Sequence, residues 1–232
     1  MYIDPAMINF KNVSKYYDGN VVALDGISFH IRPGEFVSLV GRSGAGKTTL
    51  VRLLVGEERP TEGSIEIGGW EIANISSAQV PYLRRQVATI FQDFKLLPKK
   101  TLLENVEFAL QVCGKSMKKI RTIAPQVMRI VGLENKMHRY PHEVSGGERQ
   151  RTAIARSLVY QPKILLADEP TGNLDSINAK EIIDLMLKIN SFGTTVVLVT
   201  HNRDIVNKLK RRVITLHEGR LVSDQAIGKY LI

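Results

Sequence analysis

Apolar and polar residues alternate along the first part of the chain, which is the pattern of strands with one buried face. The stretches MINFKNV (7–13) and VVALDGISFHI (21–31) repeat at a period of two residues, as half-buried antiparallel strands do. A denser apolar run, EFVSLV (35–40), ends at a glycine, and GKTTLVRLLVG (46–56) then takes helical spacing. The sequence therefore predicts two antiparallel strands, followed by a buried strand, a glycine-rich loop and a helix.

Beyond this unit the pattern predicts two short strands and then a long helical segment. The strands fall at 63–69 and 86–92, and the second is expected to lead out of the core. Helical spacing dominates from 101 to about 158. Within it, Thr101 and Glu104 have the spacing of a capping box, which marks the start of a helix.

Buried strands return after the helical segment. KILLAD (163–168) and TTVVLVTH (194–201) are continuous apolar runs of the parallel type, and the helical stretch 179–190 separates them. A hairpin is expected within 211–223. The fold class predicted is therefore α/β, with an N-terminal antiparallel β subdomain, a core in which strand, glycine loop and helix follow in the order that a P-loop NTPase needs, and an inserted α-helical subdomain.

The whole chain, 1–232, is interpreted as one domain built in pieces. We assign the β subdomain and the P-loop core to about 1–92 and 159–232, and the helical subdomain to about 93–158. With 44% apolar residues the chain can bury a sizeable core.

Several protein classes are disfavoured by composition. No uninterrupted apolar run approaches the roughly 18 residues of a membrane-spanning helix. The start of the chain lacks the basic and then apolar layout of a signal peptide, so a cytoplasmic location is expected. A single cysteine, Cys113, cannot form an internal disulfide and excludes a cysteine-rich zinc site. We expect Cys113 to serve in packing.

Positive charge is concentrated in one segment. The formal net charge is +9, and residues 81–139 carry twelve Lys or Arg against four acids, while the rest has twenty against nineteen. A local basic excess favours an acidic partner, such as nucleic acid, an anionic membrane leaflet or the acidic tail of a protein. A solvated helical face kept soluble by lysines is an equally weighted alternative.

The stretch GRSGAGKT (41–48) matches the P-loop motif G-x-x-x-x-G-K-[ST], and it lies between a predicted strand and a predicted helix. In such a loop, backbone N–H groups and the helix N-terminus cradle phosphates. Lys47 is expected to neutralise the β and γ oxygens of ATP, and the hydroxyl of Thr48 to ligate Mg²⁺. The residues assigned to the nucleotide here are Gly41, Ser43, Gly44, Ala45, Gly46, Lys47, Thr48 and Thr49.

Two acids stand at the carboxyl end of the buried strand in ILLADE (164–169). Asp168 fits the acid that approaches the metal. Glu169 lies just past the strand and fits a base that orients or deprotonates an attacking water. Two adjacent acids are more often a polar loop, but together with a P-loop they favour hydrolysis.

A second glycine-rich stretch, VSGGERQR (144–151), has no lysine that would complete a phosphate site. Ser145 and Glu148 have capping-box spacing. Gly146 and Gly147 in a first turn cost about 1 kcal/mol each relative to Ala, so we expect a phosphate to approach the backbone there. Because one nucleotide cannot be held by two complete cradles in a monomer, a head-to-tail dimer is expected, in which Ser145 of one copy closes over the P-loop of the other.

These motifs, taken in order and spacing, resemble the nucleotide-binding domain of ABC ATPases over essentially the whole chain. The resemblance implies an ABC-type core that binds ATP with Mg²⁺. The stretches that carry it are GRSGAGKTT, IFQDF, VSGGERQR, ILLADEP, GNLD and VTHN.

The resemblance also implies roles for residues outside the P-loop. Tyr17 would stack on adenine, although Tyr16 competes for that role. Gln92 would sense the metal and the γ-phosphate, as a metal ligand and catalytic residue, and couple them to a partner. Asp175 would cross the dimer interface. His201 would contact the γ-phosphate, with a simple strand-end cap as the alternative.

The chain departs from the broad family pattern in the second glycine-rich stretch and in the GNLD loop. Val144 replaces the common Leu and Glu148 the common Gln, while GNLD (172–175) stands where many members have a Ser-Ala-Leu-Asp type of loop. The resemblance implies that residues 145–147 reach the nucleotide of the opposite subunit. Glu148 still completes the capping box, so the geometry is expected to survive.

Within the family the chain is similar to the cell-division branch, especially across 80–110 and 168–175. That branch implies a homodimer in the ATP-bound state and an integral membrane partner that controls cell-wall hydrolases. It also implies peripheral association with the cytoplasmic face of the bacterial plasma membrane, with no nucleic acid bound.

Three other functions were weighed. One is the ATPase subunit of a lipoprotein-releasing or macrolide-export type of ABC transporter. Only the membrane partner distinguishes that function from the cell-division function. Another is a soluble ABC protein acting on DNA or ribosomes, which the short helical insertion and the single ABC domain disfavour. The third is a P-loop binding module without turnover, which Glu169 and His201 together disfavour.

Overall fold

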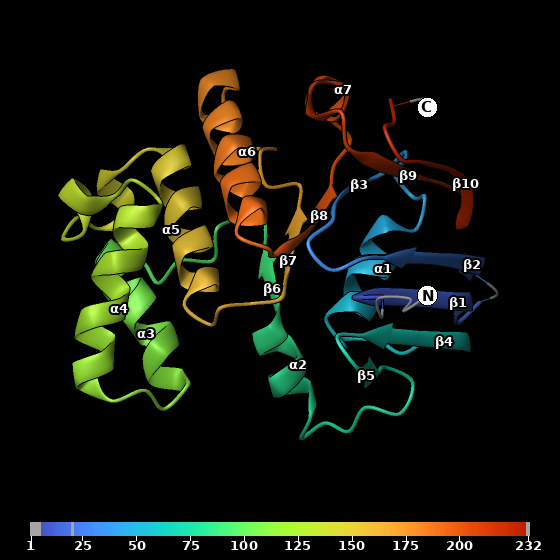
Figure 1. Cartoon of the computed structure of the whole chain (residues 1–232), viewed down its shortest axis with the longest axis horizontal. Helices are drawn as coiled ribbons and strands as arrows, with labels where there is room; N and C mark the ends of the chain where they lie inside the picture. The colour runs from blue at the N-terminus through green and yellow to red at the C-terminus, as the bar shows by residue number, and fades with distance from the viewer. Residues whose placement is uncertain (1–5, 20, 231–232) are drawn as a thin grey trace.

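The computed structural model describes residues 6–19 and 21–230. Its main sheet has six strands in the order β10-β9-β3-β8-β7-β6, as Figure 1 shows. The pairs from β9 to β6 are parallel, and β10 closes the sheet antiparallel to β9. The strands in chain order are β3 (Phe36–Val40), β6 (Val87–Ile90), β7 (Ile164–Asp168), β8 (Thr195–Val199), β9 (Arg212–His217) and β10 (Arg220–Gln225).

A second sheet is antiparallel and has the order β2-β1-β4-β5. It is built from the alternating stretches at the start of the chain, as predicted. Its first strand continues beyond 7–13 to Tyr17, because its pairing with β2 extends to Tyr17, although the pairing with β4 ends at Ser14. The strands are β1 (Ile8–Tyr17), β2 (Val21–Ile31), β4 (Glu62–Ile67) and β5 (Trp70–Glu71).

The two faces of the main sheet are covered by different layers. Along β7, Ile164 and Leu166 join the apolar cluster that includes α1 (Lys47–Leu54) and the antiparallel sheet. Leu165 and Ala167 join the other cluster, which the remaining large helices complete. Helix α1 therefore lies between the two sheets (Figure 1).

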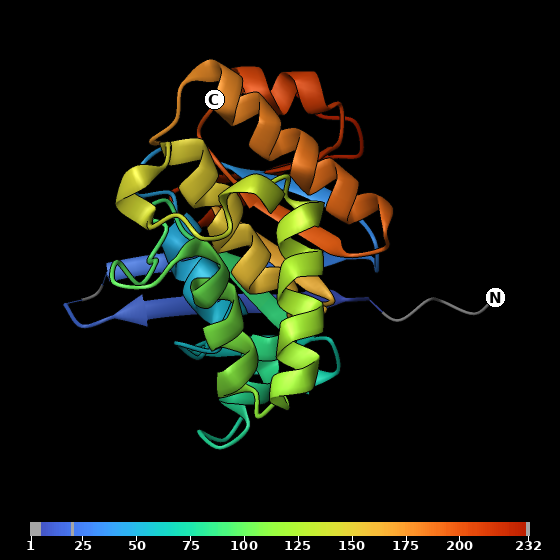
Figure 2. The same cartoon turned by 90° about the vertical axis from the view of Figure 1, so that its left-hand side faces the viewer.

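The helical layer lies on the opposite face. Figure 2 shows α3 and α4 side by side in front of the sheets. The helices of the segment and of the core are α2 (Val80–Gln86), α3 (Leu102–Val112), α4 (Met117–Ile130), α5 (Gly146–Leu158), α6 (Ser176–Ser191) and α7 (Arg203–Leu209). Two short 3-10 turns, Glu134–Lys136 and Pro141–Glu143, connect α4 to α5.

Most elements agree with the pattern of the sequence, and two helices were missed. Helices α2 and α7 are each seven residues long, too short for a clear helical period. Within the predicted stretch 86–92, Val87–Ile90 form strand β6, which pairs with β7 at the edge of the main sheet before the chain leaves for the helical layer. The subdomain boundaries near 92 and 159 stay a prediction.

No helix among the described residues is long and apolar enough to cross a membrane.

Candidate functional site

Four neighbouring parallel strands end at one edge of the main sheet, where the predicted site residues gather. The spatial order β3, β8, β7, β6 places the P-loop, His201, Glu169 and Gln92 after successive strand ends. Ligands of open α/β sheets bind beyond the carboxyl ends of the strands. Residues that are far apart in the sequence therefore share one site.

The P-loop is packed tightly against two other strands. A Cβ on Gly41 would lie 2.5 Å from the carbonyl oxygen of Leu216, and one on Gly46 would lie 2.5 Å from that of Ala23. Gly46 also has φ 98° at the N-cap of α1, a conformation that favours glycine. The glycines of the motif are thus required by the packing of the loop as well as by its approach to a ligand.

The outer side of the P-loop remains open. Ser43, Gly44 and Thr48 are exposed. The first turn of α1 has no acidic residue, and its N-cap makes no side-chain hydrogen bond. Free N–H groups at a helix N-terminus and the positive end of the helix dipole favour an anion.

Lys47 folds back over its own loop. Its Nζ donates hydrogen bonds to the carbonyl oxygens of Gly41, at 2.7 Å, and of Arg42, at 2.9 Å. Burial lowers the pKa of Lys47, while the nearby Glu169 and Asp168 oppose that change. The ammonium group therefore lies between the loop and the two acids.

Asp168 lies close to the charges of Lys47 and Glu169. Burial raises the pKa of Asp168, the neighbouring Glu169 raises it further, and Lys47 opposes the rise. A cation beside Asp168 would favour the ionised carboxylate.

The donor set suits Mg²⁺. The carboxylate of Asp168 and the hydroxyl of Thr48 are hard oxygen ligands, which Mg²⁺ prefers. No group of three or more His, Cys, Asp or Glu able to hold a metal occurs among the described residues. A site with few protein ligands fits Mg²⁺, because this ion keeps several waters and takes oxygens from the phosphates of its substrate.

Glu169 sits on a strained turn. Its φ is 47°, which costs about 1–3 kcal/mol for a residue other than glycine and occurs most often at functional sites. The turn directs the side chain toward the end of β8. There Oε1 accepts the backbone N–H of His201 at 3.0 Å and lies 2.6 Å from its Nδ1, while Oε2 accepts the hydroxyl of Thr200 at 3.2 Å. The sequence indicated both Glu169 and His201 but not their direct contact.

Gln92 pairs with the loop that precedes α6. Its Nε2 donates to Oδ1 of Asn173 at 3.0 Å, and Nδ2 of Asn173 donates back to the carbonyl oxygen of Gln92 at 3.3 Å. Asn173 was not predicted as a site residue. The two residues are 81 positions apart, so only the adjacency of β6 and β7 brings them together.

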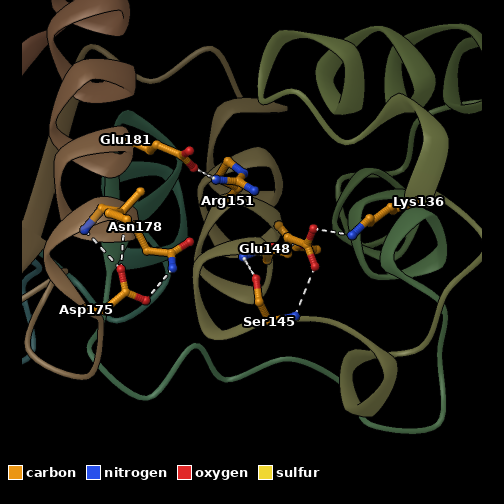
Figure 3. A network of polar contacts seen from close by, with 9 residues as sticks. Lys136, Ser145, Glu148, Arg151, Asp175, Asn178 and Glu181 are labelled. Atoms are coloured by element: carbon orange, nitrogen blue, oxygen red, sulfur yellow. Dashed lines mark hydrogen bonds and ion pairs between the residues drawn. The ribbon is translucent and has the colours of Figure 1, made fainter.

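The tip of α5 forms the expected capping box, as Figure 3 shows. Oγ of Ser145 accepts the backbone N–H of Glu148 at 3.2 Å, and Oε2 of Glu148 accepts the N–H of Ser145 at 2.9 Å. The other carboxylate oxygen of Glu148 is held by Nζ of Lys136 at 2.5 Å. Ser145 itself is exposed.

Gly147 is required by packing within the chain. A Cβ there would lie 2.0 Å from Oδ1 of Asn178 on α6. On Gly146 a Cβ would lie 3.1 Å from the side chain of Leu174. The close contact of α5 with α6 is thus a second reason for these glycines beside the phosphate expected from the sequence, and the phosphate stays a prediction.

Asp175 caps α6 and is tied to the same asparagine (Figure 3). Its Oδ1 accepts the N–H groups of Ile177 and Asn178, each at 2.9 Å, and its Oδ2 accepts Nδ2 of Asn178 at 2.5 Å. These hydrogen bonds to the carboxylate, led by those from Asn178, lower the pKa of Asp175. Asn178, which the sequence did not single out, thus connects Asp175 with Gly147.

A further ion pair joins the same two helices. Arg151 of α5 contacts Glu181 of α6 (Figure 3).

Tyr17 is linked to the first helix of the core. Its hydroxyl donates to Oε2 of Glu58 at 2.6 Å and lies 3.4 Å from Oγ1 of Thr49. Burial and the bond to Glu58 raise the pKa of Tyr17. Tyr16 points outward and is 38% exposed. Of the two tyrosines, Tyr17 is therefore the one in contact with the helix that follows the P-loop, and its stacking on adenine stays a prediction.

This fold and this arrangement of motifs define an ATP-binding cassette. The chain belongs to the ABC transporter family, whose model matches residues 24–172. The predicted α/β fold of the ABC type is confirmed, and the chain is an ATP-binding ATPase.

The chain is similar to curated cell division proteins. The chain is 47% identical over 225 residues to the cell division ATP-binding protein FtsE of Streptococcus pneumoniae serotype 2 (strain D39), covering 97% of this chain and 98% of the relative. FtsE of Bacillus subtilis (strain 168) is 47% identical over 224 residues, covering 97% and 98%. FtsE of Escherichia coli (strain K12) is 44% identical over 215 residues, covering 93% and 97%. The resemblance to the cell-division branch is confirmed.

Solved structures agree with the fold. The dimeric ATP-binding cassette MJ0796, in a post-hydrolysis state bound to ADP and Pi, has a TM-score of 0.85 at 34% identity, covering 97% of this chain and 100% of that chain. The protein cbiO1 from Clostridium perfringens, part of the ABC transporter complex cbiONQ, has a TM-score of 0.89 at 28% identity, covering 95% and 88%.

Proposed function

We propose that this chain is the ATP-hydrolysing subunit of an FtsE–FtsX-type membrane complex in bacterial cell division. The observation that carries the proposal is Glu169, held on a strained turn against His201 and beside Lys47 and Asp168, in a chain whose near-full-length relatives are FtsE proteins. ATP binding closes a homodimer, and the closure is transmitted to an FtsX-like integral membrane protein that controls cell-wall hydrolases.

The P-loop binds the triphosphate. Lys47 exchanges the carbonyl oxygens of Gly41 and Arg42 for the β and γ oxygens, which is a favourable exchange because anionic phosphate oxygens attract the ammonium group more strongly than neutral carbonyl oxygens do. Thr48, Asp168 and Gln92 would hold Mg²⁺, which would neutralise charge on the phosphates. The N–H groups at the start of α1 complete the cradle.

Glu169 acts as the base for the attacking water. Its Oε1 is shared between the backbone and the ring of His201. When His201 turns its ring to the γ-phosphate, the contact between Nδ1 and Oε1 is broken, and Oε1 can accept a proton from the water. The hydrogen bond from the backbone N–H of His201 remains and keeps the carboxylate in place. A positioned base of this kind contributes about 10²–10⁴ in rate.

A second copy of the chain completes each site. Ser145, Gly146 and Gly147 reach the nucleotide on the opposite P-loop, and Asp175 lies at the interface between the subunits. The exposed position of Ser145 at the tip of α5 supports this arrangement, as does the dimeric state of the similar cassette MJ0796. Tyr17 stacks on adenine.

The basic segment favours the membrane surface. Lys118, Lys119 and Arg121 are exposed on the first half of α4, and each well-placed cation contributes about 1 kcal/mol near an anionic leaflet. We expect peripheral association with the cytoplasmic face of the plasma membrane and no binding of nucleic acid. Reversing the three charges together should weaken recruitment to anionic vesicles while ATP binding stays unchanged. Equal recruitment of this variant would contradict a role for the segment in membrane binding.

Copurification from native membranes tests the proposed function. The Glu169→Gln variant, trapped with ATP and Mg²⁺, should retain one integral membrane partner of the FtsX type. Stoichiometric recovery of a lipoprotein-releasing or macrolide-export permease instead would contradict the proposal.

A further inference from the structure

The amide of Gln92 has a defined orientation in this structure. Nδ2 of Asn173 donates to the backbone oxygen of Gln92, so Oδ1 of Asn173 faces the Gln92 side chain. An oxygen can only accept a hydrogen bond, and therefore the donor end of the Gln92 amide, Nε2, must point toward it. The same pairing leaves Oε1 as the end that is free to act as a ligand.

The neighbouring glycine provides room for this orientation. A Cβ on Gly172 would lie 2.8 Å from Nε2 and 3.0 Å from Cδ of Gln92. The backbone of Gly172 is not in the left-handed region that favours glycine. A side chain at 172 would thus displace the Gln92 amide from this orientation, while the turn itself does not demand a glycine.

Gln150, a residue of α5, contacts the backbone on both sides of this pairing. Gln150 is completely buried, and its Nε2 donates to the carbonyl oxygen of Pro170 at 2.8 Å and lies 3.5 Å from that of Phe91. Phe91 directly precedes Gln92, and Pro170 directly follows Glu169. One buried side chain therefore fixes the distance between the Gln92 strand end and the loop that carries Asn173.

We propose that Gly172 and Asn173 are positioning residues that present Oε1 of Gln92 to Mg²⁺. This inference rests on the metal-binding role of Gln92 in the proposed function. It also gives a physical reason for the Gly-Asn pair in GNLD, where many ABC ATPases have Ser-Ala. With Asn173 removed, the amide rotates freely, and Oε1 must be ordered each time that the metal binds.

The test measures metal-dependent nucleotide binding rather than turnover. A fluorescent, non-hydrolysable ATP analogue is bound to the full chain while Mg²⁺ is titrated, and the Mg²⁺ concentration at half-maximal binding is compared. Asn173→Leu, which is nearly isosteric but lacks the acceptor, should raise this concentration about threefold to tenfold, as expected for one lost hydrogen bond. Gly172→Ala should act like Asn173→Leu because its methyl group displaces Nε2.

The Gln92→Ala background separates this inference from the proposed function. If Gln92→Ala leaves the Mg²⁺ requirement unchanged, the proposed metal role of Gln92 is wrong, and the positioning role with it. If Gln92→Ala raises the requirement and Asn173→Leu adds nothing further in that background, the positioning role is supported. An Asn173→Leu effect that persists without the Gln92 side chain, or no effect in the unmodified chain, would overturn it. Asn135→Leu, at an exposed site between α4 and α5, is the matched control and should behave like the unmodified chain.

Discussion

A single carboxylate oxygen of Glu169 meets His201 twice: Oε1 accepts its backbone N–H at 3.0 Å and lies 2.6 Å from Nδ1 of its ring. The first bond belongs to the backbone and is independent of where the ring points. The second can be exchanged when the ring turns toward a ligand. The backbone N–H of His201 thus fixes the position of the Glu169 carboxylate, while the ring of His201 determines whether Oε1 is available to the water.

Replacing the base should separate binding from turnover. Glu169→Gln keeps the size of the side chain and an oxygen for the backbone N–H of His201, but it cannot take a proton from water. We expect ATP binding to stay within about twofold and steady-state hydrolysis to fall by about 10²–10⁴, measured by phosphate release. Glu57→Gln, at an exposed position, is the control. An undiminished rate for Glu169→Gln would show that another group is the base.

Gly147 should tolerate no side chain as long as Asn178 is present. An alanine Cβ would lie 2.0 Å from Oδ1 of Asn178, so either the asparagine or α5 must move, at a cost of about 1–3 kcal/mol. The free energy of unfolding of Gly147→Ala is measured by urea denaturation.

The neighbouring glycine and a double variant provide the comparison for Gly147. The nearest neighbour of a Cβ at Gly146 is the flexible side chain of Leu174, at 3.1 Å, so Gly146→Ala should cost less. Adding Asn178→Ala to Gly147→Ala should recover part of the loss. Equal losses at 146 and 147, with no recovery in the double variant, would show that the helix contact is not the cause.

The Lys136–Glu148 ion pair predicts a defined dependence of stability on pH. Burial alone would raise the pKa of Glu148, but the hydrogen bond from Lys136 and those from Ser145 outweigh it and lower that pKa. A carboxylate whose pKa is lowered by folding stabilises the protein above its unfolded pKa of about 4.3, and this stabilisation is lost as the pH falls through the lower folded pKa.

Removing the cation should reduce that pH-dependent stabilisation. Lys136→Met raises the folded pKa of Glu148, so the variant should be less stable than the unmodified chain at neutral pH, and the difference should shrink as the pH falls below about 4. At neutral pH the difference should stay below about 1 kcal/mol, because Lys136 is half-exposed. Melting temperatures between pH 7 and pH 3.5 measure both effects. Parallel curves for the two proteins would contradict the assigned role of the pair.

Local patterns in the sequence were sufficient for much of the fold. The capping boxes that start at Thr101 and Ser145 join residues three positions apart, and both are present. The strand, loop and helix of the P-loop also follow from neighbouring residues. Such features depend on backbone periodicity and on short-range hydrogen bonds, which a sequence displays directly.

Contacts between distant elements could not be read from the sequence. Asn173 meets Gln92 only because β6 and β7 are adjacent, and Asn178 approaches Gly147 only because α5 and α6 pack closely. In the sequence these asparagines look like ordinary polar residues of a loop and a helix. One signal was present: the Gly-Asn of GNLD departs from the common pattern of the family, and the structure places both residues against Gln92.

The central claim is that two copies of the chain share each ATP, and an inter-subunit crosslink tests it most directly. Cysteines are placed at Ser43 and Ser145 in the Glu169→Gln chain, with Cys113 replaced by Ser, and a short bifunctional maleimide is added with ATP and Mg²⁺. The account predicts a covalent dimer that forms with ATP and not in a Lys47→Ala version that cannot hold the phosphates. If ATP is bound at saturation and no covalent dimer forms, the second glycine-rich stretch does not close over a partner's nucleotide.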